Sequence, residues 1–203
     1  MDFSPQNAPD YCYNFNRKIN KFCQLGSNKM KKILPFLIMA LLVLTCNRDN
    51  RERLFEMVYP NFRFDVIPGG SSFLPRVVEF NSVATNIDFY LDQSNTDPEL
   101  ITGINPYSAR IYSLDGNEFQ FVEEISVRIC PDGPDPCTPA DEAFYIDNLQ
   151  NRGDEVVELL PTLRNVKNQM LERTIKTEIV FFLSYPPPTS IESAFDMTFE
   201  AVK

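Results

Sequence analysis

The sequence has no histidine and no tryptophan among its 203 residues, and only 7 glycines against 16 prolines. Without imidazole, a Ser-His-Asp triad and a Cys-His pair are excluded, as is any zinc site that needs a histidine ligand. A Gly-rich phosphate loop and a metal-ligand motif are missing as well, so we expect no cofactor. These absences favour a binding or structural role over catalysis.

Positive charge is also scarce, with 19 Lys and Arg against 28 Asp and Glu and a net charge of −9. Proteins bind nucleic acids largely through Lys and Arg contacts with phosphates, so we expect no nucleic-acid partner. At 43% hydrophobic and 23% charged residues, the composition is typical of a globular chain.

A long hydrophobic run is missing too. The apolar stretch from Ile33 to Leu44 has 12 residues, whereas a helix that crosses a bilayer needs about 20. The apolar region of a signal peptide takes about 7–15 residues and follows basic ones, and Lys31 and Lys32 precede this stretch. We therefore interpret residues 30–45 as a signal peptide.

The segment Val43-Leu44-Thr45-Cys46 ends that stretch. It resembles the lipobox of bacterial lipoproteins, in which an aliphatic residue and two small ones precede the cysteine that is lipidated. The resemblance covers Met30 to Cys46, and Leu44 and Thr45 are bulkier than the usual residues. It implies attachment to a membrane through lipid on Cys46 and a location in the cell envelope, with the membrane and its face left open. An uncleaved membrane anchor and a buried helix of a cytosolic protein are the alternatives.

The segments on either side complete the domain organisation. Residues 1–29 are polar and lack apolar periodicity, so we interpret them as a mis-assigned or disordered leader. Residues 46–56 are expected to be a solvated tether and residues 57–203 a single domain. From Cys46 onward the chain has 13 basic and 26 acidic residues, a net charge of −13.

Two cysteines remain in the exported part once Cys46 is assigned to lipid. Cys130 and Cys137 are separated by a segment that contains three prolines and a glycine. These turn-forming residues can bring the two Cα atoms close together, and outside the cytoplasm such a pair is expected to oxidise. We predict a disulfide; a two-thiolate metal site would need further Cys or His ligands.

The apolar residues of the domain alternate with polar ones, which predicts β-strands separated by turns. We expect eight or nine strands, at residues 62–66, 78–83, 87–91, 100–104, 107–114, 118–129, 143–146, 175–183 and 195–201. Asp115-Gly116 predicts a hairpin between two of them. Apolar spacing of three and four, interrupted by Pro161, predicts one short helix from Leu163 to Leu171. The fold class expected is mainly all-β, a sandwich of Ig-like or jelly-roll type.

Acidic side chains supply the few candidates for a reactive or metal site. Asp132, Asp135, Asp141 and Glu142 offer oxygen ligands of the kind that calcium prefers, but without the spacing of an EF-hand. We favour a solvated acidic loop over a calcium site. Carboxylate pairs for a glycosidase-type reaction exist at Glu123-Glu124 and at Asp154-Glu155, although neighbours in a strand point to opposite faces.

Aromatic and proline residues supply the candidates for partner contact. Tyr107, Tyr112 and Tyr145 occupy strand positions from which they could stack on sugar rings, although the missing tryptophan weakens this prediction. Tyr185, Pro186, Pro187 and Pro188 form a rigid segment that could dock a protein or glycan partner; the alternative is that the prolines end an edge strand.

These features together predict a lipid-anchored protein of the cell envelope that acts by binding or as a structural element, not by catalysis. The ligand, protein or glycan, would meet the end loops at 130–137 and 185–188. The alternative is a carboxylate-based hydrolase on a jelly-roll scaffold.

Overall fold

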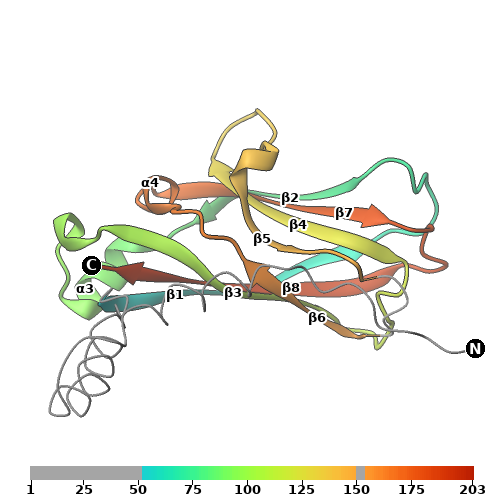
Figure 1. Ribbon diagram of the computed structural model, residues 1–203, viewed down its shortest axis with the longest axis horizontal. Helices are drawn as coiled ribbons and strands as arrows, with labels where there is room; N and C mark the ends of the chain where they lie inside the picture. Colours follow the sequence, from blue (N-terminus) through green and yellow to red (C-terminus); the bar gives the residue numbers. More distant parts are fainter. Residues whose placement is uncertain (1–51, 150–153) are drawn as a thin grey trace, which may run out of the picture. The chain divides into compact units, whose positions relative to one another are not determined.

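The computed structural model describes residues 52–149 and 154–203 (Figure 1). The predicted leader, signal peptide and lipidation site Cys46 lie outside these residues. The elements are β1 (Arg53–Val66), β2 (Arg76–Ala84), α3 (Ile87–Ser94), η2 (Pro98–Leu100), β3 (Gly103–Ser113), β4 (Val122–Pro131), η3 (Pro139–Asp141), β5 (Glu142–Ile146), β6 (Val156–Pro161), α4 (Lys167–Met170), β7 (Thr174–Leu183) and β8 (Ile191–Val202).

Strand pairing shows that the domain is a jelly roll. The eight strands follow the order β1-β8-β3-β6-β5-β4-β7-β2. Every pair is antiparallel, and the first strand pairs with the last, the second with the seventh, the third with the sixth and the fourth with the fifth. This nested pairing is that of a chain folded double and then rolled into two sheets. It confirms the all-β prediction and selects the jelly roll over the Ig-like alternative.

The two sheets enclose one apolar core. The eight strands form one continuous sheet, because β6 also pairs with β5 through Leu160 and Tyr145. The lower half of this sheet in Figure 1, strands β1-β8-β3-β6, is called the lower sheet, and the upper half, β5-β4-β7-β2, the upper sheet. Alternate residues of each strand face inward, as the pleat requires. The rings of Phe144 in the upper sheet and Phe199 in the lower sheet lie 5.5 Å apart, and those of Phe64 and Phe181 lie 5.9 Å apart.

The sandwich has two ends of different construction. The near end is where β1 begins; it holds α3, η2 and α4, and the loop between Cys130 and Cys137 follows β4 there. The far end is where β1 ends; its described segments include the loops at residues 67–75, 114–121 and 184–190. None of the helices in the described part is long and apolar enough to cross a membrane.

The strand predicted at residues 87–91 is wrong, because this segment forms the helix α3 at the near end. Ile87 is buried, and Tyr90 and Leu91 pack against the core, at the i, i+3 and i+4 spacing of a helix face. The alternation of Ile87, Phe89 and Leu91 predicts a strand, but Phe89 is 61% exposed and does not face the core. The expected strand at residues 100–104 is likewise replaced by η2 and by the start of β3 at Gly103.

Two further predictions are corrected by the topology. The expected hairpin at Asp115-Gly116 is wrong, because β3 and β4 do not pair and the turn carries the chain from the lower sheet to the upper one. The predicted helix over 163–171 shrinks to α4, and the apolar residues before Pro161 form β6. Strand β1 begins at Arg53, within the residues 46–56 that were predicted to be a tether.

Candidate functional site

The disulfide predicted between Cys130 and Cys137 is present, with the two Cα atoms 5.6 Å apart. It joins the last part of β4 to the end of the loop that follows, so it closes this loop against the outer face of the upper sheet. Both cysteines are buried. In the chain-entropy model a ring of this size stabilises the folded state by about 2.5 kcal/mol.

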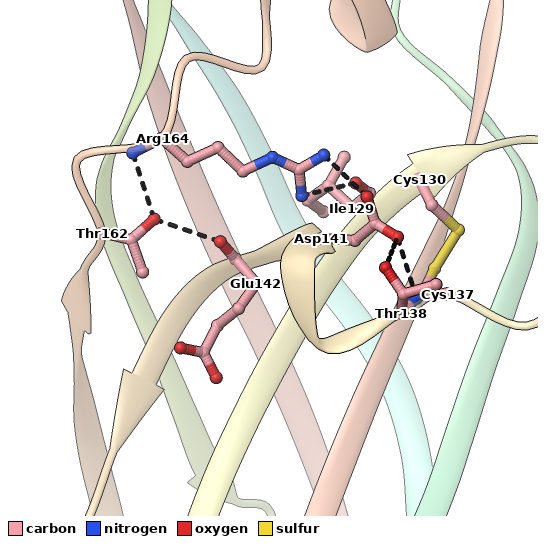
Figure 2. A network of polar contacts seen from close by, with 8 residues as sticks. All are labelled: Ile129, Cys130, Cys137, Thr138, Asp141, Glu142, Thr162 and Arg164. Carbon is pink, nitrogen blue, oxygen red and sulfur yellow. Dashed lines mark hydrogen bonds and ion pairs between the residues drawn. A yellow bond between two sulfur atoms is a disulfide. The ribbon is translucent and has the colours of Figure 1, made fainter.

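A polar network continues from the disulfide to the segment before α4 (Figure 2). Asp141 accepts hydrogen bonds from the Thr138 N–H at 2.8 Å and from its hydroxyl at 2.7 Å. The Arg164 guanidinium donates to Asp141 at 2.8 Å and to the carbonyl of Ile129 at 3.3 Å. Burial opposes ionisation of Asp141, but these hydrogen bonds hold its pKa below the usual value. These bonds tie the loop that follows β4 to the segment before α4, through which the chain passes from β6 in the lower sheet to β7 in the upper sheet.

A buried ion pair lies beneath the loop between Cys130 and Cys137. Lys176 and Glu178 of β7 are 3% and 2% exposed, and their charged groups are 3.0 Å apart. The loop seals the pair, because the Cys137 N–H donates to Glu178 at 2.9 Å and Lys176 donates to the Asp135 carbonyl at 3.3 Å. The hydrogen bond to Glu178 raises the pKa of Lys176. Both charges are thus satisfied by the loop and by each other.

The four acidic residues considered for calcium do not converge. Asp132 accepts hydrogen bonds from the backbone and hydroxyl of Ser82, which lower its pKa. Asp141 is paired with Arg164, and the contacts of Asp135 and Glu142 are made through their backbone carbonyls. Within the described ranges, no group of three acidic or sulfur ligands is placed to hold a metal ion.

The segment from Tyr185 to Pro188 lies at the far end, between β7 and β8. Tyr185 is 46% exposed, but Pro187 is buried. Because β7 runs between β4 and β2, the prolines do not end an edge strand. The loop at 130–137 lies at the opposite end of β7, so the two loops predicted to contact a partner do not form one surface.

The outer face of the lower sheet carries a shallow groove of about 430 Å³, lined by polar side chains of β3, β6 and β8 and by Val58 and Pro60 of β1. Ser108 of β3 and Thr198 of β8 are direct cross-strand partners and form its floor. In the next row, Arg110 lies between Asp196 of β8 and Glu158 of β6. The groove exists because two short hydroxyl side chains are flanked by longer charged ones.

Ion pairs hold the side chains around this groove in place. The Arg110 guanidinium donates two hydrogen bonds to Asp196, at 2.9 and 2.8 Å. Asp196 also accepts from the backbone of Asn61 at 2.8 Å and from the Tyr112 hydroxyl at 3.5 Å. The hydrogen bonds from Arg110 to Asp196 raise the pKa of Arg110, and the two parallel bonds hold both side chains in a preorganised arrangement.

A second arginine–tyrosine–carboxylate unit lies on the same strands toward the near end. The Arg53 guanidinium is 4.5 Å from the centre of the Tyr107 ring and 3.2 Å from Glu200. It also bonds to Glu56, so it bridges two carboxylates that face each other across β1 and β8. Without the guanidinium, this pair of like charges would be unfavourable.

The structure separates the three tyrosines considered for sugar stacking. Tyr107 and Tyr112 belong to β3 in the lower sheet, whereas Tyr145 belongs to β5, on the other side of β6. Sequence reasoning missed the groove residues Ser108, Arg110, Glu158, Asp196 and Thr198. The available signal was the polar phase of the alternation in β3, β6 and β8, but which polar positions become neighbours depends on pairing across distant segments.

Comparisons with known proteins do not assign this chain to a family. No family model matches the chain, and no curated protein matches it. Among solved structures it is similar to a chain of the Cocksfoot mottle virus structure, over 78% of this chain and 85% of that one, with 10% identity and a TM-score of 0.29. A likeness at this level carries no conclusion about fold or function.

Proposed function

We propose that this chain is a lipid-anchored, non-catalytic binding protein of the cell envelope, and that the groove on the lower sheet binds a glycan. One observation carries the proposal: a preorganised polar groove with hydroxyls on its floor and an arginine–carboxylate pair along its side. Sugars present alternating hydroxyl donors and acceptors, which such paired groups can bind without moving.

The charges around the groove favour an uncharged ligand. Arg110 is compensated by Asp196 and lies beside Glu158, while Arg53 is compensated by Glu56 and Glu200. An anionic ligand would meet these carboxylates, and an apolar one would leave the ion pairs without solvent or hydrogen-bonding partners. A hydroxyl-rich ligand can replace the water on these groups with hydrogen bonds of its own.

The proposed anchor is compatible with this location of the groove. Arg53 follows Cys46 by seven residues, a length that reaches at most about 25 Å. Lipid on Cys46 would therefore keep the near end close to the membrane and leave the outer face of the lower sheet accessible. The Cys130–Cys137 disulfide supports export, because disulfides persist in oxidising compartments.

Glycan binding can be tested with the unlipidated exported chain, residues 46–203 with Cys46→Ser, on an array of cell-wall and host glycans followed by calorimetry. Ser108→Tyr fills the floor of the groove and is expected to abolish binding, and Arg110→Ala to weaken it at least tenfold. Arg63→Ala is the matched control, since Arg63 is exposed on β1 opposite Ala194, outside the groove. Binding that survives Ser108→Tyr would contradict the proposed site.

The anchor has a separate test. Metabolic labelling with a fatty acid and mass spectrometry of the mature N-terminus are expected to show an acylated Cys46, and Cys46→Ser is expected to release the chain from the membrane fraction. An intact Met1 in the envelope fraction would contradict the proposal. Protease treatment of intact cells then distinguishes surface display from a periplasmic location.

A hydrolase on this scaffold is the second candidate, and the positions of Asp196 and Glu158 favour it. They flank β3 from both sides, so their backbones are about 10 Å apart. Inverting glycosidases place their two carboxyl groups about 6.5–9.5 Å apart, which side chains on this spacing can reach. The ion pair between Asp196 and Arg110 favours a binding role over hydrolysis. Release of reducing ends from a bound glycan, lost in Glu158→Gln, would support hydrolysis.

A further inference from the structure

The loop between β1 and β2 exposes large apolar side chains that the domain does not bury. Ile67, Phe73 and Leu74 are 67%, 95% and 68% exposed, and Val77 at the start of β2 is 47% exposed. Elsewhere at the far end the core is closed from within by Phe119 and Phe121, which are both buried. The loop at 67–75 is therefore the most exposed apolar segment of this end, where Leu114 and Tyr185 are 41% and 46% exposed.

The geometry of the loop keeps Phe73 away from its own domain. Gly69 and Gly70 have φ values of 79° and 78°, a conformation that other residues rarely adopt. A Cβ atom at Gly70 would lie 3.0 Å from the Arg76 guanidinium, which donates to the carbonyl of Ile67. The Phe73 N–H donates to the Ser71 hydroxyl at 3.1 Å. The chain is thus held in a turn from which the Phe73 ring extends.

A groove of about 470 Å³ lies directly beside this loop. It is bordered by the loop and by the ends of β1 and β2, the two strands at the open edges of the sheet, and Val66, Val78 and Phe181 line it. Leu74 contributes to the lining, whereas Phe73 does not. The volume falls in the range of pockets that hold whole small molecules, so an aromatic ring fits.

The groove is bordered by one charge of each sign, so this patch is complementary to the same patch on a second copy. Asp65 of β1 and Arg76 of β2 both line it, and neither forms an ion pair with another described residue. If two copies meet about a two-fold axis, the same patch is used twice, so Asp65 of each copy can approach Arg76 of the other. The patch thus combines the exposed Phe73 ring, the groove and one charge of each sign, as such a two-fold contact requires.

We infer that the far end is a self-association surface, in which Phe73 of each copy enters the groove of a second copy. The exposed apolar side chains amount to roughly 400 Å² per copy, taking about 150 Å² for each fully exposed side chain. Two copies together bury roughly 800 Å² of such surface, which is below the about 1,000 Å² of stable specific interfaces and belongs to weak, transient contacts. The dimer is therefore weak and concentration-dependent, and anchoring in a membrane would strengthen it by raising the effective concentration.

Sedimentation of residues 46–203 with Cys46→Ser over a wide concentration range tests this inference. The expected result is a monomer–dimer equilibrium in which Phe73→Ser raises the dissociation constant by at least about thirtyfold. Phe89→Ser is the matched control, because Phe89 is 61% exposed on α3 at the near end. Asp65→Arg and Arg76→Asp are each expected to weaken the dimer, and the double variant to restore it.

Three outcomes would overturn the inference: a monomer at every concentration, a dimer that persists in Phe73→Ser, or failure of the double charge reversal to restore association. Vesicles of phosphatidylethanolamine and phosphatidylglycerol provide the other arm. A monomer that co-sediments with them only when Phe73 is present would identify the loop as a membrane contact instead. Self-association requires neither the lipid nor the glycan, so its failure leaves the proposed function untouched, and the reverse also holds.

Discussion

The two ends of the sandwich are stabilised in different ways. At the near end, side chains bond the connecting segments to the sheets: the Tyr59 hydroxyl donates to the Thr85 carbonyl at 2.6 Å, and the Tyr90 hydroxyl contacts both the N–H and the carbonyl of Val58. The disulfide and the Arg164 network add to this. At the far end, the loop at 67–75 has few such bonds and leaves its apolar residues in solvent.

This difference indicates a division of roles. The near end carries the disulfide and most of the side-chain bonds between connecting segments and sheets, whereas the loop at 67–75 of the far end exposes apolar groups that the fold does not bury. Substitutions at the two ends should accordingly separate stability from association.

The largest effect is expected from removing the disulfide. Cys130→Ser with Cys137→Ser should lower the free energy of unfolding by about 2.5 kcal/mol, because the unfolded chain loses its constraint. The measurement is urea denaturation followed by circular dichroism. A reductant should lower the stability of the wild type by a similar amount and leave the double variant unchanged; equal stability of all samples would contradict the assignment.

A smaller loss is expected at Arg164. Arg164→Ala removes the hydrogen bonds to Asp141 and to the Ile129 carbonyl, and should cost about 1–3 kcal/mol in unfolding free energy, as bonds to charged groups do. Arg63→Ala, at an exposed position of β1, serves as the control. If both variants unfold at the same denaturant concentration, the network of Figure 2 does not stabilise the domain.

Acid should affect both ends through carboxylates with lowered pKa values. The hydrogen bond from the Ser113 hydroxyl, with those from the backbones of Glu192 and Asn117, lowers the pKa of Asp115 to about 2. A carboxylate with a lower pKa in the folded state contributes stability above its unfolded pKa of about 4, and this is lost as pH falls toward 2.

Thermal melting between pH 5 and 2 measures this dependence. Asp115→Asn should make the fall in melting temperature shallower through the far end, and Asp141→Asn should do the same through the near end. Asp97→Asn, at the start of η2, is a comparison variant from the same class of loop carboxylates. An unchanged pH profile in both test variants would contradict the assigned hydrogen bonds.

The smallest effect on stability is expected at the tip of the far end. Phe73→Ser should change the free energy of unfolding by less than about 0.5 kcal/mol, because the side chain is 95% exposed and makes little contact with its own domain. Leu163→Ser, at a fully exposed near-end position, should likewise leave the free energy of unfolding almost unchanged. A clear destabilisation by Phe73→Ser would show that the loop packs onto its own domain.

Local patterns in the sequence anticipated several parts of the fold. The alternation in Phe62, Phe64 and Val66, and in the segments of β7 and β8, predicted strands that the structure contains. The short spacing of Cys130 and Cys137 predicted their bond. These features depend on residues close together in the chain, so the pattern alone was sufficient.

Where two patterns overlapped, or where pairing was distant, sequence reasoning failed. Residues 87–91 fit both a strand and a helix, and packing against Phe55 and Tyr59 of β1 selected the helix. The groove was out of reach for another reason: Asp196 and Glu158 meet Arg110 from strands that are remote in the chain. Neither partner could be read from the neighbourhood of Arg110.

By itself, the sequence determined a β-rich chain without imidazole, a disulfide-closed acidic loop and the expectation of a lipid anchor, because composition, alternation and short spacings are local properties. The tertiary structure decided that the strands nest as a jelly roll, that Arg110 lies between two carboxylates, and that Phe73 projects beside an apolar groove. These depend on strand register and on the direction of each chain reversal, which are set by the packing of the whole core.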